Sequence, residues 1–228
     1  MIFRIREEDQ KMTQRLPALA LCLLPFAASA ADEFIPIEQE PRHKLVFANK
    51  HVRYFDVELE PGYESRYHWH RNDGVFVNIA SSPTIAEDAG KEPVRRGERA
   101  IGETYFIDYA ARPKAHRVTN AGTTPYHVID AEILSACGTA GVASEANQAL
   151  LIDNERVLVT RIILHPGEST VLHPPCGILV SVSGGDIAFD GERAGMRPAA
   201  FKWRQQAGTT TLVNTGKLVF HGVDIRLK

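Results

Sequence analysis

The chain has 228 residues, of which 44% are hydrophobic and 24% charged, and its formal net charge at pH 7 is −2. This length is sufficient for one large or two small domains with real hydrophobic cores. A near-neutral chain without a basic stripe excludes nucleic acid as an expected partner.

Residues 1–30 have the layout of a secretory signal peptide. Lys11 and Arg15 precede an apolar run, Leu16–Phe26, and small residues follow at 28–30. A basic start, a short apolar middle and small residues at the cleavage site are typical of such signals. The run is too short for a permanent transmembrane helix, and the alternative interpretation is an ordinary N-terminal helix.

Cleavage would place the start of the mature chain near Ala31, and Met12 is an alternative translation start. We therefore expect a periplasmic or secreted protein. No stretch after residue 30 is long and apolar enough for a stable membrane span. Only Cys137 and Cys176 would remain after cleavage. An oxidising compartment permits a disulfide between them, and two buried free thiols are the alternative.

Short strands are expected throughout the mature part. Runs rich in β-branched and aromatic residues alternate with Gly, Pro and Asn, a pattern typical of strands and turns. The runs cover 52–59, 75–79, 104–107 and 127–134 in the first half, and 157–164, 178–182 and 218–225 in the second. No stretch has a long helical period. The predicted fold class is therefore all-β.

The second half of the chain repeats the first. At a constant offset of 105 residues, Asn49, Val52, Leu59, Pro61, Gly62 and His68 match Asn154, Val157, Leu164, Pro166, Gly167 and His173. At a constant offset of 94 residues, Asn120, Gly122, His127 and Asp130 match Asn214, Gly216, His221 and Asp224. Two blocks in one order indicate duplication. The first copy is eleven residues longer, around the polar stretch 81–99.

From this repeat we predict three segments after the signal peptide. The first module covers 31–134, a small-residue linker covers 135–147, and the second module covers 148–228.

The pair His68 and His70 is the main candidate for chemistry. On a strand, residues two apart face the same side, so both imidazoles would project inward while Trp69 faces away. Two imidazoles from one strand need a third ligand from a neighbouring strand, and His116 is the candidate supplier. We predict a metal site at His68, His70 and His116, against the alternative that three histidines fill a polar interior.

These residues resemble the motifs of the cupin superfamily. Glycine, five residues and then His-x-His is its first motif, which Gly62, His68 and His70 satisfy. The second motif ends in a histidine, three intervening residues and then an asparagine, which His116 and Asn120 satisfy. Counting both copies, the resemblance covers nearly the whole mature chain and implies a bicupin. It implies two tandem double-stranded β-helix (jelly-roll) barrels, with the metal inside the first.

The glutamate that cupins usually carry after the second histidine is missing, since Gly74 and Val75 occupy those positions. Asp73, one residue earlier, is an alternative ligand whose direction depends on strand parity. The site therefore resembles the three-histidine variant found in thiol, β-diketone and gentisate dioxygenases. Three imidazoles bind Fe(II), Mn, Ni, Cu or Zn, and the resemblance favours Fe(II).

The second copy lacks the site. Its residues at the positions of His70 and His116 are Pro175 and Thr210, so His173 stands alone. By the same logic, residues kept in both copies are interpreted as scaffold: His127 with His221, and Asp130 with Asp224. Tyr67, Tyr105 and Arg117 are further candidates for lining the cavity, with packing or a solvated face as the alternative.

The resemblance to three-histidine dioxygenases implies a metal-dependent, dioxygenase-like oxidoreductase. A metal held by three neutral ligands keeps its full charge, so we expect its substrate to be a small anion. One alternative is a metal-dependent isomerase or lyase, and another is a non-catalytic small-ligand-binding protein. No Ser-His-Asp order, phosphate loop or paired-carboxylate signature supports metal-free hydrolysis. Open β barrels commonly associate through strand edges, so a homodimer is a further expectation.

Overall fold

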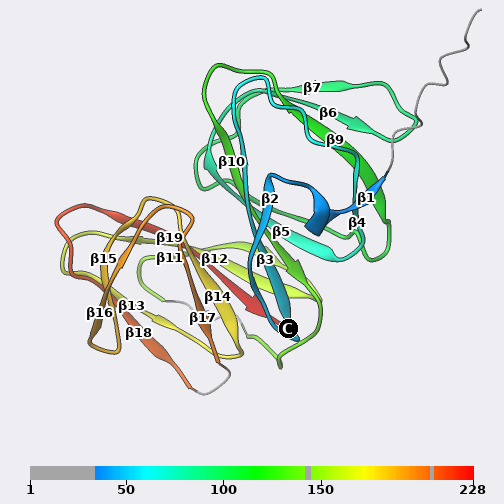
Figure 1. Ribbon diagram of the computed structural model, residues 1–228. Coiled ribbons are helices and arrows are strands. Elements are labelled where there is room, and N and C mark those ends of the chain that lie inside the picture. Colours follow the sequence, from blue (N-terminus) through cyan, green and yellow to red (C-terminus); the bar gives the residue numbers. More distant parts are fainter. Residues whose placement is uncertain (1–33, 142–144, 206–207) are drawn as a thin grey trace, which may run out of the picture. The chain divides into compact units, whose positions relative to one another are not determined.

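Strands dominate the computed structural model, which describes residues 34–141, 145–205 and 208–228 (Figure 1). The predicted signal peptide and residues 142–144 of the predicted linker lie outside the described residues. Within the described residues the only helix is a short 3-10 turn, η1 (Ile37–Gln39). In this part of the chain, no helix is long and apolar enough to cross a membrane.

The first barrel consists of two five-stranded sheets. One sheet has the order β1-β4-β9-β6-β7, with bounds Ile35–Pro36, His68–His70, Lys114–Asn120, Thr84–Asp88 and Val94–Arg96. The other has the order β2-β3-β10-β5-β8, with bounds His43–Ala48, Val52–Leu59, Tyr126–Ile133, Asp73–Ala80 and Thr104–Ile107. Apart from the consecutive pairs β2–β3 and β6–β7, neighbouring strands come from distant parts of the chain, which is the strand arrangement of a jelly roll.

The second barrel repeats this order. Its first sheet is β11-β12-β19-β14-β17, with bounds Gln148–Asp153, Val157–Leu164, Phe220–Leu227, Gly177–Ser181 and Phe201–Arg204. Its second sheet is β13-β18-β15-β16, with bounds Ser169–Leu172, Thr210–Asn214, Gly185–Phe189 and Glu192–Met196. The prediction of an all-β chain with two tandem jelly-roll barrels is confirmed.

Residues that the two copies share hold the same turns. Asn120 donates from Nδ2 to the carbonyls of Leu59 and Thr124, both over 2.8 Å, and Asn214 makes the equivalent bonds in the second barrel. The glycines of the shared Pro-Gly pairs have positive φ, +79° at Gly62 and +83° at Gly167, where a side chain would be strained. The repeated signature is therefore a signature of the scaffold.

The two barrels pack sheet against sheet. Buried apolar side chains of β3, β5 and β10 form one core with those of β12, β14 and β19, so these strands are buried on both faces. Tyr54 donates its hydroxyl across this core to the carbonyl of Ala199 over 3.0 Å. Each barrel also has its own interior cluster, and the contents of these two interiors differ sharply.

Candidate metal centre

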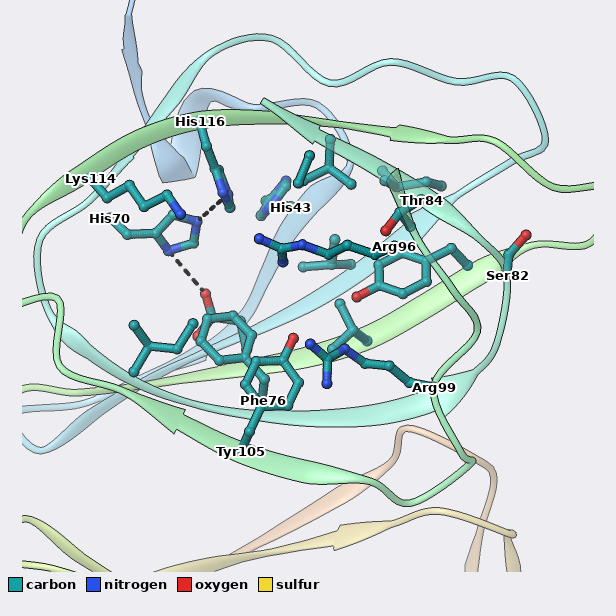
Figure 2. A pocket seen from close by; sticks show the side chains of 18 of the residues that line it. His43, His70, Phe76, Ser82, Thr84, Arg96, Arg99, Tyr105, Lys114 and His116 are labelled. Atoms are coloured by element: carbon teal, nitrogen blue, oxygen red, sulfur yellow. Dashed lines mark hydrogen bonds and ion pairs between the residues drawn. The ribbon is translucent and has the colours of Figure 1, made fainter. Parts of the chain in front are cut away.

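The three predicted ligands come together on two hydrogen-bonded strands. β4 supplies His68 and His70, and its pairing with β9 places His68 opposite His116. The three imidazole rings have centroids 4.8–5.0 Å apart. His70 Nε2 lies 3.1 Å from His116 Nε2 (Figure 2). Trp69, between them in sequence, packs on the other side of the strand against Phe34, as strand alternation requires.

Three nitrogens of this cluster are buried without a hydrogen-bond partner among the described residues: His68 Nε2, His70 Nδ1 and His116 Nδ1. His68 donates from Nδ1 to the carbonyl of Arg66 over 2.8 Å, which leaves Nε2 with a free lone pair. Buried polar atoms normally have partners. The Nε2 atoms of His70 and His116 face each other, and one ring nitrogen from each of His43, His68 and His70 lies within 4.8 Å of the other two. Imidazole nitrogens gathered in this way are a donor set that suits a transition-metal ion, so the residues present fit a divalent metal.

The environment keeps these imidazoles neutral. Burial and, after it, the charge of the nearby His43 lower the pKa of His68 to about 3, against the opposing effects of its backbone hydrogen bond and the charge of Glu40. Burial also places the pKa values of His70 and His116 well below the ordinary value, with neighbouring imidazoles as the next cause. A metal binds the neutral form of imidazole. The cluster therefore needs no deprotonation before it can coordinate an ion at neutral pH.

A fourth histidine, His43, belongs to the same cluster, although no motif in the sequence pointed to it. It is the first residue of β2 and is 8% exposed. Its ring centroid lies 4.3 Å from that of His68 and 6.4 Å from that of His70. One ring nitrogen from each of these three residues lies within 4.8 Å of the other two. The signal that could have found it is the repeat, since the 105-residue offset places Gln148 at this position.

Glu40 holds the His43 ring from behind. Its Oε2 lies 2.7 Å from His43 Nδ1 and accepts the backbone N–H of Arg42 over 2.7 Å, while Tyr63 donates to Oε1 over 3.0 Å. Burial by itself raises the pKa of Glu40, but hydrogen bonding to His43, its charge and the other two bonds outweigh this and lower the pKa to about 2. A carboxylate behind an imidazole is the arrangement that orients metal-binding histidines.

Asp130 borders the cluster, contrary to the interpretation of this residue as scaffold. It is 1% exposed on β10, and its Oδ2 lies 3.5 Å from His70 Nδ1. Burial raises the pKa of Asp130 well above its usual range, and the charge of Glu132 adds to this. His127, also on β10, instead lies 2.6 Å from Asp56 and does not line the cavity described next.

Asp73 is not a ligand, and the expectation that it could replace the missing glutamate is wrong. Its Oδ1 accepts the backbone N–H of Ala110 over 3.0 Å, and its Oδ2 accepts Arg156 Nε over 2.9 Å. Arg156 precedes the first long strand of the second barrel, so the carboxylate serves the contact between barrels. None of the three candidate positions, Asp73, Gly74 and Val75, therefore supplies an oxygen to the histidines.

The histidine cluster opens into a cavity of about 90 Å³ inside the first barrel. This is several times the space that one water molecule needs. Cationic side chains project into it from β7, the following loop and β9: Arg96, Arg99 and Lys114 (Figure 2). Aromatic rings line another part: Phe76, Tyr105, Tyr109 and Tyr126. Burial raises the pKa values of all three tyrosines, so their hydroxyls stay protonated.

Of the further lining candidates, only Tyr105 borders the cavity. Tyr67 donates its hydroxyl to Glu87 over 2.5 Å. Arg117 forms an ion pair with the same carboxylate over 2.8 Å and is not among the lining residues. These two side chains form a polar network on the outer surface of the sheet that carries the histidines.

The second barrel has a solid interior where the first has the cavity. Nine buried apolar side chains fill it: Ile162, Leu164, Leu172, Leu179, Ile187, Phe189, Met196, Leu212 and Phe220. The retained His173 lies 2.6 Å from Glu145, and Gln148 donates to Thr170 and to the carbonyl of Val171. Among the residues that the structure describes, this barrel therefore lacks the ligands for a metal centre like that of the first, and apolar side chains fill the corresponding space.

Solved structures with the same architecture carry the cupin name. A cupin 2 conserved barrel domain protein from Leptotrichia buccalis aligns with a TM-score of 0.50 and 10% identity, covering 80% of this chain and 86% of its own. The fold is that of a bicupin.

Two further solved structures are similar to this chain over most of its length. The bacterial pirin YhhW from Escherichia coli, in complex with nickel(II), aligns with a TM-score of 0.58 and 14% identity, covering 80% of this chain and 89% of its own. A salicylate 1,2-dioxygenase from Pseudaminobacter salicylatoxidans aligns with a TM-score of 0.56 and 11% identity, covering 83% and 77%. No protein-family model matches the sequence, and no curated protein matches it.

Proposed function

We propose that this bicupin is a dioxygenase-like oxidoreductase that holds one divalent metal through His68, His70 and His116, with Fe(II) favoured. The observation that carries the proposal is the set of buried, neutral imidazoles with unpartnered nitrogens beside a cavity. A ferrous ion bound there would supply a Lewis-acidic, redox-active centre with positions left open for small molecules.

The rest of the cavity suits a small anion with an aromatic or enolisable body. Arg96, Arg99 and Lys114 give the cavity positive charge, which raises the local concentration of anions. Protonated tyrosine hydroxyls add hydrogen-bond donors, and the ring of Phe76 adds an apolar wall.

Two of the similar structures support this chemistry by analogy. The pirin was solved with nickel(II), and the salicylate dioxygenase has also been solved in complex with gentisate. Both are under 25% identical to this chain, so they support the fold directly and the reaction only through the site.

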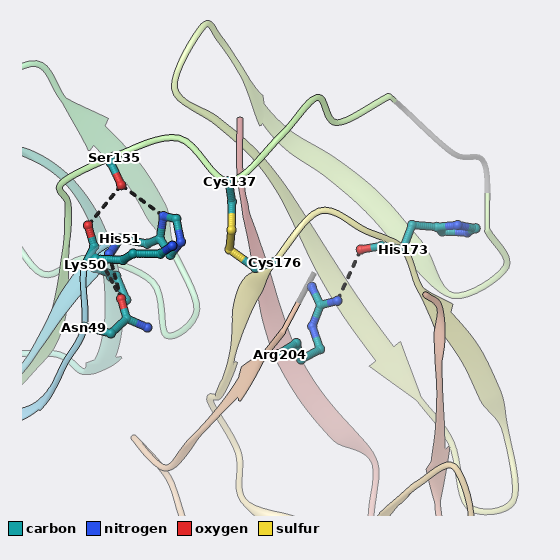
Figure 3. The surroundings of a disulfide bond; sticks show 9 residues. Asn49, Lys50, His51, Ser135, Cys137, His173, Cys176 and Arg204 are labelled. Atoms are coloured by element: carbon teal, nitrogen blue, oxygen red, sulfur yellow. Dashed lines mark hydrogen bonds between the residues drawn. A yellow bond between two sulfur atoms is a disulfide. The ribbon is translucent and has the colours of Figure 1, made fainter. Parts of the chain in front are cut away.

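The proposed location is the periplasm or the extracellular space. The layout of residues 1–30 supports it, and so does a disulfide between Cys137 and Cys176 (Figure 3). Their Cα atoms are 5.8 Å apart, within the usual range for a bridge, so the free-thiol alternative is wrong. The bond ties the segment after β10 to the start of β14, and such bonds persist in oxidising compartments.

The test is metal content followed by oxygen uptake. Elemental analysis of protein purified from its native compartment should find about one first-row metal ion per chain. The His68→Ala variant should lose it, and His127→Gln, which changes a histidine outside the cavity, should keep it. The iron-loaded protein should then consume oxygen with at least one member of a panel of small carboxylates and phenolates.

The outcomes separate the alternatives. Absence of metal from the native protein, or unchanged metal content in His68→Ala, would overturn the metal site itself. Tight binding of an anion without oxygen uptake or turnover would favour a ligand-binding protein. Conversion of the anion without oxygen uptake would favour an isomerase or lyase.

A further inference from the structure

The missing cupin glutamate leaves the histidine cluster without a carboxylate ligand from β5, and a fourth imidazole, that of His43 on β2, lies against His68. We infer that His43 is a fourth metal ligand and that Glu40 positions it, so that the centre is a four-histidine site. This inference rests on the proposed function, because it concerns the same metal.

The start of the first barrel is built to bring His43 to the cluster. β1 pairs in parallel with β4, with Ile35 opposite His68. The chain then turns through η1, whose Ile37 is 1% exposed, and two backbone bonds, from Glu40 to Ile37 and from His43 to Glu40, close the turn. His43 is thereby fixed between the cluster and β3, where it pairs with Val57.

The hydrogen bonds around His43 leave one nitrogen available. Nδ1 is taken by Glu40 Oε2 at 2.7 Å, so Nε2 is the nitrogen free for a metal. Glu40 is not itself the replacement ligand, because both of its oxygens already accept hydrogen bonds, from Arg42, His43 and Tyr63. The carboxylate instead fixes the orientation of the ring and makes it a better donor.

The rings of His43 and His68 are also close without being bonded. Their centroids are 4.3 Å apart with an interplanar angle of 54°. Nε2 of His68 has no hydrogen-bond partner among the described residues. Two neutral imidazoles held this way gain nothing from each other, whereas a cation between their nitrogens would give both a partner.

The duplication offers an independent argument. At the 105-residue offset, Glu40 corresponds to Glu145 and His43 to Gln148. The second barrel kept the glutamate, which lies 2.6 Å from the retained His173, but it lost the histidine together with the residues equivalent to His70 and His116. His43 therefore follows the pattern of His70 and His116, the two ligands that the second barrel lost.

Two measurements on nickel(II) test the inference. In crystals of the nickel-loaded full chain, the anomalous peak should lie about 2.1 Å from one nitrogen of each of His43, His68, His70 and His116, a normal metal–imidazole distance. In chelator competition, His43→Gln, which copies the second barrel, should bind nickel(II) at least about 10–100-fold more weakly, the loss expected even for an orienting partner. Glu40→Gln should lose about 10–100-fold.

His127→Gln is the matched control, because it removes a histidine that also lies beside a carboxylate but outside the cavity. Its nickel affinity should equal that of the unaltered protein.

A peak bound by only three histidines, with the His43 ring out of range, would overturn the four-histidine centre and leave the proposed function standing. The crystal arm needs no variant, so it decides the matter even if His43→Gln misfolds. A full chain that binds no nickel(II) at all would overturn the four-histidine centre, and absence of any metal from the native protein would overturn the proposed function with it.

Discussion

The two barrels share one strand order and have opposite interiors. Equivalent positions differ in size and polarity: Gly74 corresponds to Leu179, and Tyr126 to Phe220. A Cβ at Gly74 would lie 2.9 Å from the Phe76 ring and 3.0 Å from Asp130 Oδ1, so glycine there makes room for the acidic side of the cavity. The comparison teaches that a jelly roll can be stabilised either by a packed interior or by a site that leaves space.

The buried aspartates show the same contrast in charge. Asp224 of the second barrel forms an ion pair with Arg204 and lies 3.8 Å from Arg226. Pairing of Gly74 with Ile107 and of Leu179 with Lys202 places Tyr109 where the second barrel has Arg204. Both oxygens of Asp130 lack hydrogen-bond partners among the described residues. The buried aspartate of the second barrel is thus paired with arginine, whereas Asp130 of the first barrel lies beside the histidine cluster.

The largest expected effect is on the free energy of unfolding and comes from removing Arg204, the arginine paired with the buried Asp224. Arg204→Ala leaves the buried Asp224 without its main partner, and breaking a buried ion pair from one side costs about 3–5 kcal/mol of unfolding free energy. The triple change Arg204→Met, Asp224→Leu and Arg226→Leu should cost far less, because all three charges of this buried network are removed together. Urea unfolding monitored by tryptophan fluorescence measures both, and equal losses in the two variants would contradict the charge argument.

Metal loading should stabilise the first barrel only through its own histidines. With free nickel(II) at about 100 times its dissociation constant, the unfolding free energy should rise by about 2.7 kcal/mol. His70→Ala should abolish this gain, and His173→Ala, at a histidine of the second barrel, should preserve it. Thermal or urea unfolding with and without the metal gives the difference. A gain that His173→Ala also removes would contradict the assignment of the metal to the first barrel.

Acid should destabilise the metal-free protein through the same histidines. The pKa of His68 is about 3 in the folded chain and 6.5 in the reference state, so the unfolded chain binds the proton first as pH falls. Above about pH 6.5 this group does not lower the free energy of unfolding. Between about pH 6.5 and 3, each pH unit of acidification lowers that free energy by about 1.4 kcal/mol. In the presence of a chelator, His68→Gln should reduce the slope of unfolding free energy against pH in this window by about that amount. An unchanged slope would contradict it.

The strands and turns of the scaffold could be predicted well, because strand periodicity and repeated turn residues are visible in short stretches of the sequence. Asn120, Gly62 and their counterparts recur since each copy needs the same turns. Spacing within one strand was also sufficient to bring His68 and His70 together. His43 lay beyond such reasoning because it reaches the cluster through β1 and η1, a path with no periodic signal. Asp130 was missed because it recurs in the second copy as Asp224, which suggested a shared scaffold role. The two aspartates have different neighbours, His70 in the first barrel and Arg204 in the second.

The smallest expected effect concerns the anion that the first cavity is proposed to take. Arg99 and Lys114 each form an ion pair with a carboxylate, Glu103 and Asp88, whereas Arg96 reaches the cavity from the edge strand β7 and is exposed. Water and salt screen an exposed charge, so Arg96→Gln should weaken binding of a small carboxylate by only about two- to fivefold. Nickel(II) affinity should not change, because Arg96 is not among the candidate ligands. Calorimetric titration at low and at high salt measures the effect, which should shrink as salt rises.

The matched change Arg193→Gln, on the corresponding edge strand β16 of the second barrel, should leave anion binding unaltered. Equal losses in the two variants would mean that the anion responds to the charge of the whole surface and not to the cavity of the first barrel.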